Sequence, residues 1–257
     1  MRTEPSISHC DIFGDLHGCL PEWLELMELL GYTPDTEGLW RHPEGRRLVL
    51  VGDLTDRGPD NVGVLRLAMK LFGAGQLLLV RGNHDDKLQR ALRGSKVQVR
   101  GGLARTLAEI EAEPTDFVPA VIDFLDNLPL QLLLDEARLL VVHAGIRTDL
   151  IGRDDGEARA FCLFGETTGR LMTDGFYERL DWTRNYDGAP YVVYGHDAKL
   201  TPYENNRTID IDTGCAFGNR LTALRYPEMR LHQVPARRAY STAKPHLIRP
   251  ELRSTLL

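Results

Sequence analysis

Short apolar runs that end in glycine followed by a polar residue recur along this 257-residue chain. In the first part of the chain they alternate with segments of helical spacing. Strands are predicted over His9–Asp15, Arg47–Asp53 and Gln76–Asn83. Helices are predicted over Pro21–Gly31, Asn61–Phe72, a short stretch ending near Arg93, Leu103–Glu113 and Asp116–Leu125. Alternating strands and helices of this kind are typical of a layered α/β fold.

The later part of the chain is richer in strands. They are predicted over Gln131–Asp135, Leu139–Gly145, Tyr191–His196, Thr208–Gly214, Leu221–Tyr226 and Arg230–Val234. The first two read as a strand pair, and the short spacing of the last three favours antiparallel pairing among them. The pattern as a whole therefore predicts an α/β class with mixed sheets.

Composition excludes several classes of protein. The 31 Lys and Arg against 37 Asp and Glu give a formal net charge of −6, which disfavours a broad nucleic-acid surface. The chain lacks both an apolar run of roughly 18 residues for a membrane helix and the apolar stretch of a signal peptide. Its 4 cysteines are scattered, which favours reduced thiols. We expect a cytoplasmic protein that makes no membrane contact.

Polar residues collect where the early strands end. Asp15 and His17 follow the first strand, and side chains two residues apart in extended backbone project to the same side. Asp53 ends a fully apolar strand, where a carboxylate needs a cation or hydrogen-bond donors. Asp56 and Arg57 come next in a loop bounded by Gly and Pro. The Arg57 guanidinium could hold a phosphate there, or simply form a turn salt bridge with Asp56.

Histidines occupy the same position at other strand ends. Asn83 and His84 follow the third early strand, and His143 and His196 each follow a later one. A lone histidine at a strand end is usually a packing residue. The repetition here matters because open α/β sheets bind ligands at the carboxyl edge of their strands.

The donor set indicates metal ions. Carboxylate, amide and imidazole donors without cysteine suit Mn²⁺, Fe²⁺ or Zn²⁺ better than Ca²⁺. There are too many donors for one ion that must also bind substrate, whereas two ions sharing one carboxylate accommodate them. Such paired ions activate a water for in-line displacement at phosphorus.

The order of these motifs resembles that of a known family. The matching segments are Asp15-x-His17, Gly52-Asp53-x-x-Asp56-Arg57-Gly58, Gly82-Asn83-His84-Asp85, His143 and Gly195-His196. Together they resemble the calcineurin-like metallophosphoesterases, especially the phosphoprotein phosphatase branch. Val141–Ile146 and Ile211–Asn219 are similar to a bacterial group that holds symmetrical bis(5′-nucleosyl)-tetraphosphatases and the phosphatase domain of polynucleotide kinase-phosphatases.

The resemblance implies a layered α-β-β-α sandwich of two mixed sheets with a dinuclear metal site at the carboxyl ends of the strands. The catalytic domain is expected to span residues 1–236. The basic residues of 237–257 favour an extended, solvated tail, and the alternative is a basic arm that touches an anionic substrate. Two divalent ions are implied, with Mn²⁺ favoured and Fe²⁺, Zn²⁺, Ni²⁺ or Co²⁺ as alternatives. The residues implied as metal ligands are Asp15, His17 and Asp53 for the first ion and Asp53, Asn83, His143 and His196 for the second, with Asp53 as the bridge.

The resemblance also implies catalytic roles. A hydroxide bridging the metals would attack phosphorus, Arg57 would clamp the phosphoryl oxygens, and His84, oriented by Asp56, would protonate the leaving oxygen. One departure is Ala198, because many diesterases of the superfamily carry a metal-binding histidine there; the phosphatase branch does not. Residues weighed as substrate contacts are Arg179, Arg184 and Asp212, the last equally well read as a structural turn carboxylate.

The favoured substrate is a phosphorylated small molecule, a dinucleoside polyphosphate, with diadenosine tetraphosphate cleaved to two ADP. A serine/threonine protein phosphatase acting on phosphoproteins would share every catalytic residue. A nucleic-acid end phosphatase or 2′,3′-cyclic phosphodiesterase fits the net charge less well. A non-catalytic scaffold is disfavoured because the ligand set is complete.

Overall fold

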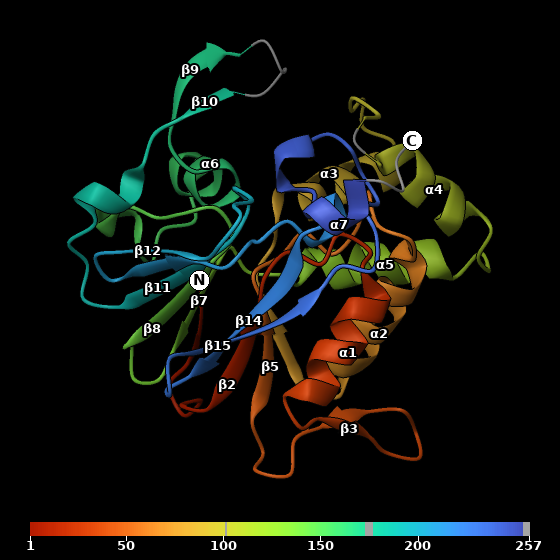
Figure 1. The fold of residues 1–257 in the computed structure, drawn as a ribbon, viewed down its shortest axis with the longest axis horizontal. Helices are drawn as coiled ribbons and strands as arrows, with labels where there is room; N and C mark the ends of the chain where they lie inside the picture. The colour runs from red at the N-terminus through yellow and green to blue at the C-terminus, as the bar shows by residue number, and fades with distance from the viewer. Residues whose placement is uncertain (101, 173–176, 254–257) are drawn as a thin grey trace.

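Two β-sheets packed face to face between helical layers form the computed structural model, which describes residues 1–100, 102–172 and 177–253 (Figure 1). The first sheet has the strand order β15-β14-β2-β5-β6. Its strands span Arg230–Pro235 (β15), Arg220–Tyr226 (β14), Cys10–Phe13 (β2), Arg47–Leu50 (β5) and Leu77–Leu79 (β6). β2, β5 and β6 run parallel, so their carboxyl ends meet at one edge.

The second sheet has the strand order β1-β7-β8-β11-β13-β12. Its strands span Arg2–Glu4 (β1), Gln131–Leu134 (β7), Leu139–Val142 (β8), Tyr191–Tyr194 (β11), Thr208–Asp210 (β13) and Tyr203–Asn205 (β12). β7 and β8 form the predicted pair, which is antiparallel, whereas β8, β11 and β13 run parallel. The segments that follow β8, β11 and β13 therefore also emerge at a common edge.

Helices cover the outer face of each sheet. The first sheet packs against α1 (Leu20–Leu29), α2 (Asn61–Gly73), α3 (Asn83–Leu92), α4 (Leu103–Glu111) and α5 (Phe117–Asp126). The second packs against α6 (Gly156–Phe164). Leu48 and Leu50 face the helices, whereas Val49 faces the second sheet, as the alternation of a strand requires. The α-β-β-α sandwich with two mixed sheets is thus confirmed.

Within the described part of the chain, no helix has both the length and the apolar character needed to cross a membrane.

One predicted strand pairing is wrong. β14 and β15 do pair antiparallel, but β13 belongs to the other sheet, where it pairs with β11 and β12. The reason is the glycine-bounded turn Cys215–Phe217, with Gly214 and Gly218 both in left-handed backbone. This turn carries the chain from one sheet to the other. Close spacing in sequence could not reveal that change of layer.

Several elements had no readable pattern. α6 was not predicted, nor were the hairpins β9–β10 (Thr167–Leu171 and Tyr177–Arg179) and β3–β4 (Thr33–Pro34 and Trp40–Arg41). Every residue of β9 is exposed, so the strand lacks the alternation that predicts a half-buried one. In Figure 1, β9 and β10 project away from the body beyond α6.

The C-terminal segment differs from the extended tail expected. Residues 237–253 pack against the two-sheet body and include α7 (Pro250–Arg253). Leu247 is only 1% exposed and clusters with Ala198 and Phe217. Arg249 donates to the carbonyl oxygens of Gly218 (3.3 Å) and Ala236 (2.7 Å). The basic residues of this segment suggested a solvated tail. The burial of Leu247 and the hydrogen bonds of Arg249 instead hold the segment against the body of the protein.

Candidate active site

The loops after the strands hold several candidate residues in strained backbone. Non-glycine residues rarely adopt a positive φ, and such strain concentrates at functional sites. The candidates with positive φ are His17 (44°), Asp53 (53°), Asp56 (76°), Arg57 (71°) and His196 (76°). The turns therefore aim these side chains at one region above the strand ends.

Two motif glycines permit this convergence. A Cβ atom on Gly82 would collide with the carboxylate and backbone nitrogen of Asp53, and one on Gly195 would collide with the carboxylate of Asp15. Each glycine therefore lets one loop approach the acidic residue of another. The sequence shows the glycines beside the ligands, but only the structure explains them.

Asp53 lies between two groups of potential metal ligands. The atoms of His17, Asp53 and His84 lie within 4.8 Å of one another, as do those of Asp53, His143 and His196. Asp53 Oδ2 lies 3.5 Å from Nε2 of His17, and its Oδ1 lies 3.5 Å from Nε2 of His143. One carboxylate thus presents an oxygen to each group, which is the arrangement that a bridging ligand requires.

The remaining predicted ligands border these groups. Asp15 Oδ2 lies 3.9 Å from Nε2 of His17, and the Asp15 carboxylate accepts the backbone N–H of His196 at 3.2 Å. Oδ1 of Asn83 lies 3.0 Å from Nε2 of His143. All six predicted metal ligands are therefore brought together. Ala198 packs with Phe217 and Leu247.

The tautomers of the buried histidines suit the binding of cations. Nδ1 of His143 faces the carbonyl oxygen of Val51 (2.9 Å) and must donate to it. Burial lowers the pKa of His143 to about 4, so its Nε2 carries a lone pair that faces Oδ1 of Asn83. Nδ1 of His17 is likewise held by the carbonyl of Thr55 at 2.8 Å, which leaves its Nε2 facing Asp53 and Arg57. A cation between Nε2 of His143 and Oδ1 of Asn83 would stabilise their facing lone pairs.

Two further observations fit a cationic occupant. Nε2 of His196 is buried and has no hydrogen-bond partner within the described ranges. Burial, reinforced by the charges of Asp212 and Asp53, raises the pKa of Asp15 well above its usual range. Burial also raises the pKa of Asp53 to about 7, despite the hydrogen bond from the backbone N–H of His84. Positive charge would stabilise the ionised form of both carboxyl groups.

His84 sits beside the ligand groups and is held by Asp56. Nδ1 of His84 lies 2.5 Å from Oδ2 of Asp56, whose Oδ1 accepts the Thr106 hydroxyl at 2.6 Å. This leaves Nε2 of His84 2.9 Å from the guanidinium of Arg57, which also contacts Nε2 of His17. Burial, and next the Arg57 charge, lower the pKa of His84 well below its usual range. An anion bound beside Arg57 would offset the second of these causes.

Asp85 has a positioning role that the sequence did not reveal. Its Oδ2 accepts the backbone N–H groups of Asp53 (2.9 Å) and Gly82 (2.8 Å), and its Oδ1 accepts that of Leu54 (3.0 Å). The carboxylate therefore ties the Asp53 loop to the start of α3. The one feature of the sequence that could have drawn attention to Asp85 is its position directly after His84 in the third motif.

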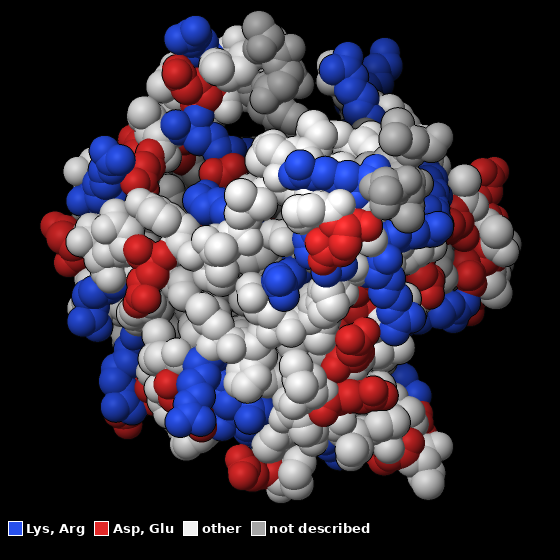
Figure 2. Space-filling model, in the orientation of Figure 1, with Lys and Arg blue, Asp and Glu red and all other residues white. Residues whose placement is uncertain are grey.

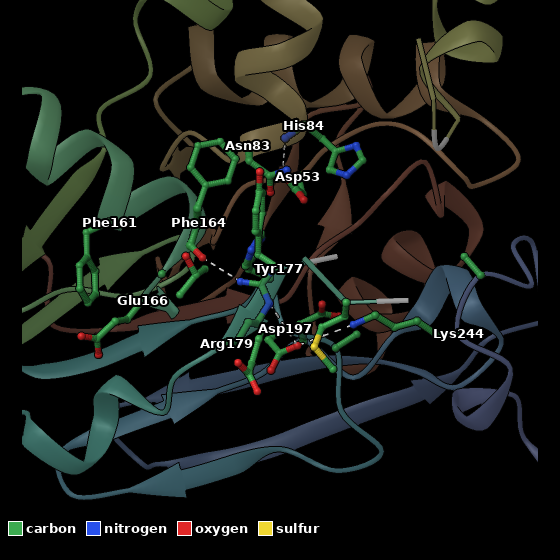
Figure 3. A pocket seen from close by; sticks show the side chains of 18 of the residues that line it. Asp53, Asn83, His84, Phe161, Phe164, Glu166, Tyr177, Arg179, Asp197 and Lys244 are labelled. Carbon is green, nitrogen blue, oxygen red and sulfur yellow. Dashed lines mark hydrogen bonds and ion pairs between the residues drawn. The ribbon is translucent and has the colours of Figure 1, made fainter. Parts of the chain in front are cut away.

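A pocket of about 1160 Å³ opens beside these residues, between the β9–β10 hairpin and the C-terminal segment. Asp53, Asn83 and His84 lie at one side of it, whereas Arg179 and Lys244 reach Asp197 from elsewhere on its wall (Figure 3). In Figure 2 the surface is hollowed beside the hairpin, with basic and acidic side chains along the hollow.

The three predicted substrate contacts fall in different places. Arg179 and Asp212 line the pocket, although Oδ1 of Asp212 also accepts the N–H of Gly214 at 2.9 Å, as a turn carboxylate would. Arg184 does not line the pocket. Its side chain is 76% exposed and pairs with Asp181 at 3.0 Å. Lys244, which belongs to the basic C-terminal segment, also lines the pocket.

Comparison with known proteins identifies the family of this chain. The model of the calcineurin-like phosphoesterase family matches residues 10–200. The chain belongs to this family. Calcineurin-like phosphoesterases are metal-dependent hydrolases of phosphate esters, so the chain is a phosphoesterase that uses divalent metal ions.

Relatives within this phosphoesterase family match nearly the whole chain. The bis(5′-nucleosyl)-tetraphosphatase PrpE [asymmetrical] of Geobacillus thermodenitrificans is 45% identical over 232 residues, 89% of this chain and 94% of that protein. The protein of the same name from Bacillus thuringiensis is 45% identical over 88% of this chain and 94% of its own. A crystal structure of a candidate diadenosine tetraphosphatase is 25% identical, with a TM-score of 0.67 over 91% of this chain and 97% of that one.

Proposed function

We propose that this phosphoesterase hydrolyses dinucleoside polyphosphates, with diadenosine tetraphosphate as the representative substrate. The observation that carries the proposal is the 45% identity, over 89% of the chain, to a protein named a bis(5′-nucleosyl)-tetraphosphatase. The size of the pocket supports it, because about 1160 Å³ exceeds the usual range for a drug-sized ligand.

The metal ions would be held as the two ligand groups suggest. Asp15, His17 and Asp53 would hold the first ion. Asp53 would also contact the second, which Asn83, His143 and His196 complete. We favour Mn²⁺, since mixed oxygen and imidazole donors suit it. Two such ions, when bound, supply an activated water and stabilise negative charge on the phosphoryl group.

Arg57 and His84 would handle the reacting phosphate. The Arg57 guanidinium lies over the ring of Phe217 at 5.2 Å, which supports its planar group beside the ligands. There it can hold phosphoryl oxygens through parallel hydrogen bonds. His84, with Nδ1 held by Asp56, directs Nε2 to the same region and would protonate the leaving oxygen. Bound phosphate would raise the pKa of His84 by opposing the charge of Arg57.

The rest of the pocket suits a chain of phosphates ending in a nucleoside. Arg179 and Lys244 both face Asp197, at 3.7 Å in each case, so both charges lie along the pocket wall. Phe164 is 47% exposed and Tyr177 is 58% exposed, and both line the pocket (Figure 3). Aromatic faces left this open can stack on a nucleobase.

The position of cleavage separates two forms of this activity. The motif resemblance predicted symmetrical cleavage of the tetraphosphate, which gives two ADP. The name of these relatives specifies asymmetrical cleavage, which divides the tetraphosphate into unequal products, ATP and AMP. We favour the asymmetrical products, because the similarity to these relatives extends over nearly all of the chain.

The test is a comparison of products. Protein stripped with a chelator and restored with Mn²⁺ is given diadenosine tetraphosphate or a phosphoserine peptide, and the products are separated by ion-exchange chromatography. We expect ATP and AMP from the dinucleotide and slow release of phosphate from the peptide. Formation of two ADP would support the proposed substrate but show that cleavage is symmetrical. Rapid peptide dephosphorylation with the dinucleotide intact would contradict the proposal in favour of a protein phosphatase.

Arg179→Ala is expected to raise KM for diadenosine tetraphosphate by about tenfold while changing kcat little, because one hydrogen bond to a charged group contributes about 1.5–3 kcal/mol. Arg184→Ala is the matched control, since Arg184 also pairs with an aspartate but lies outside the pocket. Initial-rate kinetics of both variants measure the difference. Equal KM values for the two variants would remove Arg179 from substrate binding.

A further inference from the structure

A second cluster of metal-binding side chains lies away from the phosphate pocket. The Sγ atoms of Cys19 and Cys215 and one carboxylate oxygen of Glu22 lie within 4.8 Å of one another. Cys19 caps the N-terminus of α1, Glu22 lies in its first turn, and Cys215 begins the turn that follows β13. None of these residues lines the pocket.

Glu22 lacks a partner that its burial requires. Its side chain is 0% exposed, and none of the ion pairs among the described residues involves it. Oε1 accepts the backbone N–H of Arg237 at 2.9 Å and the hydroxyl of Tyr240 at 2.7 Å. Oε2 is buried without a hydrogen-bond partner in the described part of the chain. A buried carboxylate in this position is costly unless a cation or donor completes it.

The surroundings fix the carboxylate in the way that ligating groups are usually fixed. Metal-binding carboxylates are commonly held by hydrogen bonds to the oxygen that does not bind. The two donors on Oε1 hold Glu22 in this manner and leave Oε2 available. Two sulfur atoms beside one carboxylate oxygen form a donor set that selects Zn²⁺ over Mg²⁺ or Mn²⁺.

We propose that Cys19, Cys215 and Glu22 form a structural zinc site, separate from the catalytic ions. The two thiols bind as thiolates and release their protons to solvent, and the Glu22 carboxylate is the third protein ligand. The site joins three segments: the loop that leaves His17, the turn that follows Asp212, and the C-terminal segment through Tyr240. It therefore fixes the segment that carries Lys244 to the pocket.

Cadmium provides a probe that distinguishes this site from the catalytic one. Cd²⁺ bound to thiolate has an ultraviolet charge-transfer absorption, whereas Cd²⁺ bound to oxygen and imidazole does not produce it. Titrating chelator-stripped, reduced full-length protein with Cd²⁺ is expected to develop this absorption to saturation at one thiolate-bound ion per chain. Wild-type protein that shows no such absorption would overturn the proposal without any variant.

Cysteine variants locate the signal. Cys215→Ala and Cys19→Ala are expected to abolish the saturable absorption, whereas Cys162→Ala should retain it. Cys162 is the matched control because its thiol is equally buried but lies on the inner face of α6, in a different core cluster. Circular dichroism checks that each variant is folded. Retention of the full absorption in Cys215→Ala, or its equal loss in Cys162→Ala, would contradict the assignment.

Discussion

Asp53→Asn is expected to lower kcat for diadenosine tetraphosphate by about 10³-fold, which corresponds to about 4 kcal/mol of transition-state stabilisation. Oδ1 and Oδ2 of Asp53 face different ligand groups, each 3.5 Å from a histidine nitrogen. The asparagine amide presents one oxygen and one NH₂ group, which only donates hydrogen bonds, so it cannot serve both ions. The loss should appear in kcat at saturating Mn²⁺, measured by product formation.

Asp135→Asn is the matched control for this substitution. Asp53 and Asp135 are both buried carboxylates in left-handed backbone, with φ of 53° and 51°, which asparagine also tolerates. Asp135 accepts hydrogen bonds from Arg138 and Tyr226 at the far end of β8 from His143. We expect its variant to keep wild-type kcat. Activity of Asp53→Asn above about a tenth of wild type would contradict the two-metal assignment.

His84→Ala is expected to slow hydrolysis of an alkyl phosphate ester by about 10²-fold, the usual contribution of a general acid. The effect on a p-nitrophenyl ester should be far smaller, because p-nitrophenolate leaves without protonation. Nε2 of His84 has the position for this proton transfer, since Nδ1 is held by Asp56 at 2.5 Å. Steady-state rates on the two esters give the ratio that isolates the leaving-group step.

His9→Ala is the control for His84→Ala, because His9 is exposed and its side chain hydrogen-bonds only to Ser8 among the partners described. It should leave both rates unchanged. Asp56→Asn should shift the ratio in the same direction as His84→Ala, since it removes the group that orients the ring. Equal losses on both esters in His84→Ala would assign His84 a role in metal or phosphate binding instead.

The sequence was most informative where chemistry is local. Asp53 and His143 could be placed at strand ends because each follows a run of apolar residues that the sequence shows directly. The same alternation predicted the α/β class. What brings Asp53 and His143 to one point is the packing of two sheets, and this followed from the family resemblance rather than from periodicity.

The sequence was least informative where contacts are long-range. The role of Asp85 depends on three backbone N–H groups from two loops, and no residue pattern encodes their convergence. Arg179 and Arg184 look alike in sequence, but only Arg179 lines the pocket. The C-terminal segment looked solvated because of its charge, yet burial of Leu247 fixes it beside the pocket. Packing decided each of these cases.

Electron paramagnetic resonance of Mn²⁺-loaded protein is a direct test of whether Asp53 joins two metal ions. Chelator-stripped protein is reloaded with Mn²⁺ and measured beside Asp53→Asn. Two ions about 3.5–4 Å apart are close enough to couple magnetically. We expect a spin-coupled signal in the wild-type protein that is absent from the variant. Signals from magnetically isolated Mn²⁺ alone in the wild-type protein would contradict a bridging role for Asp53.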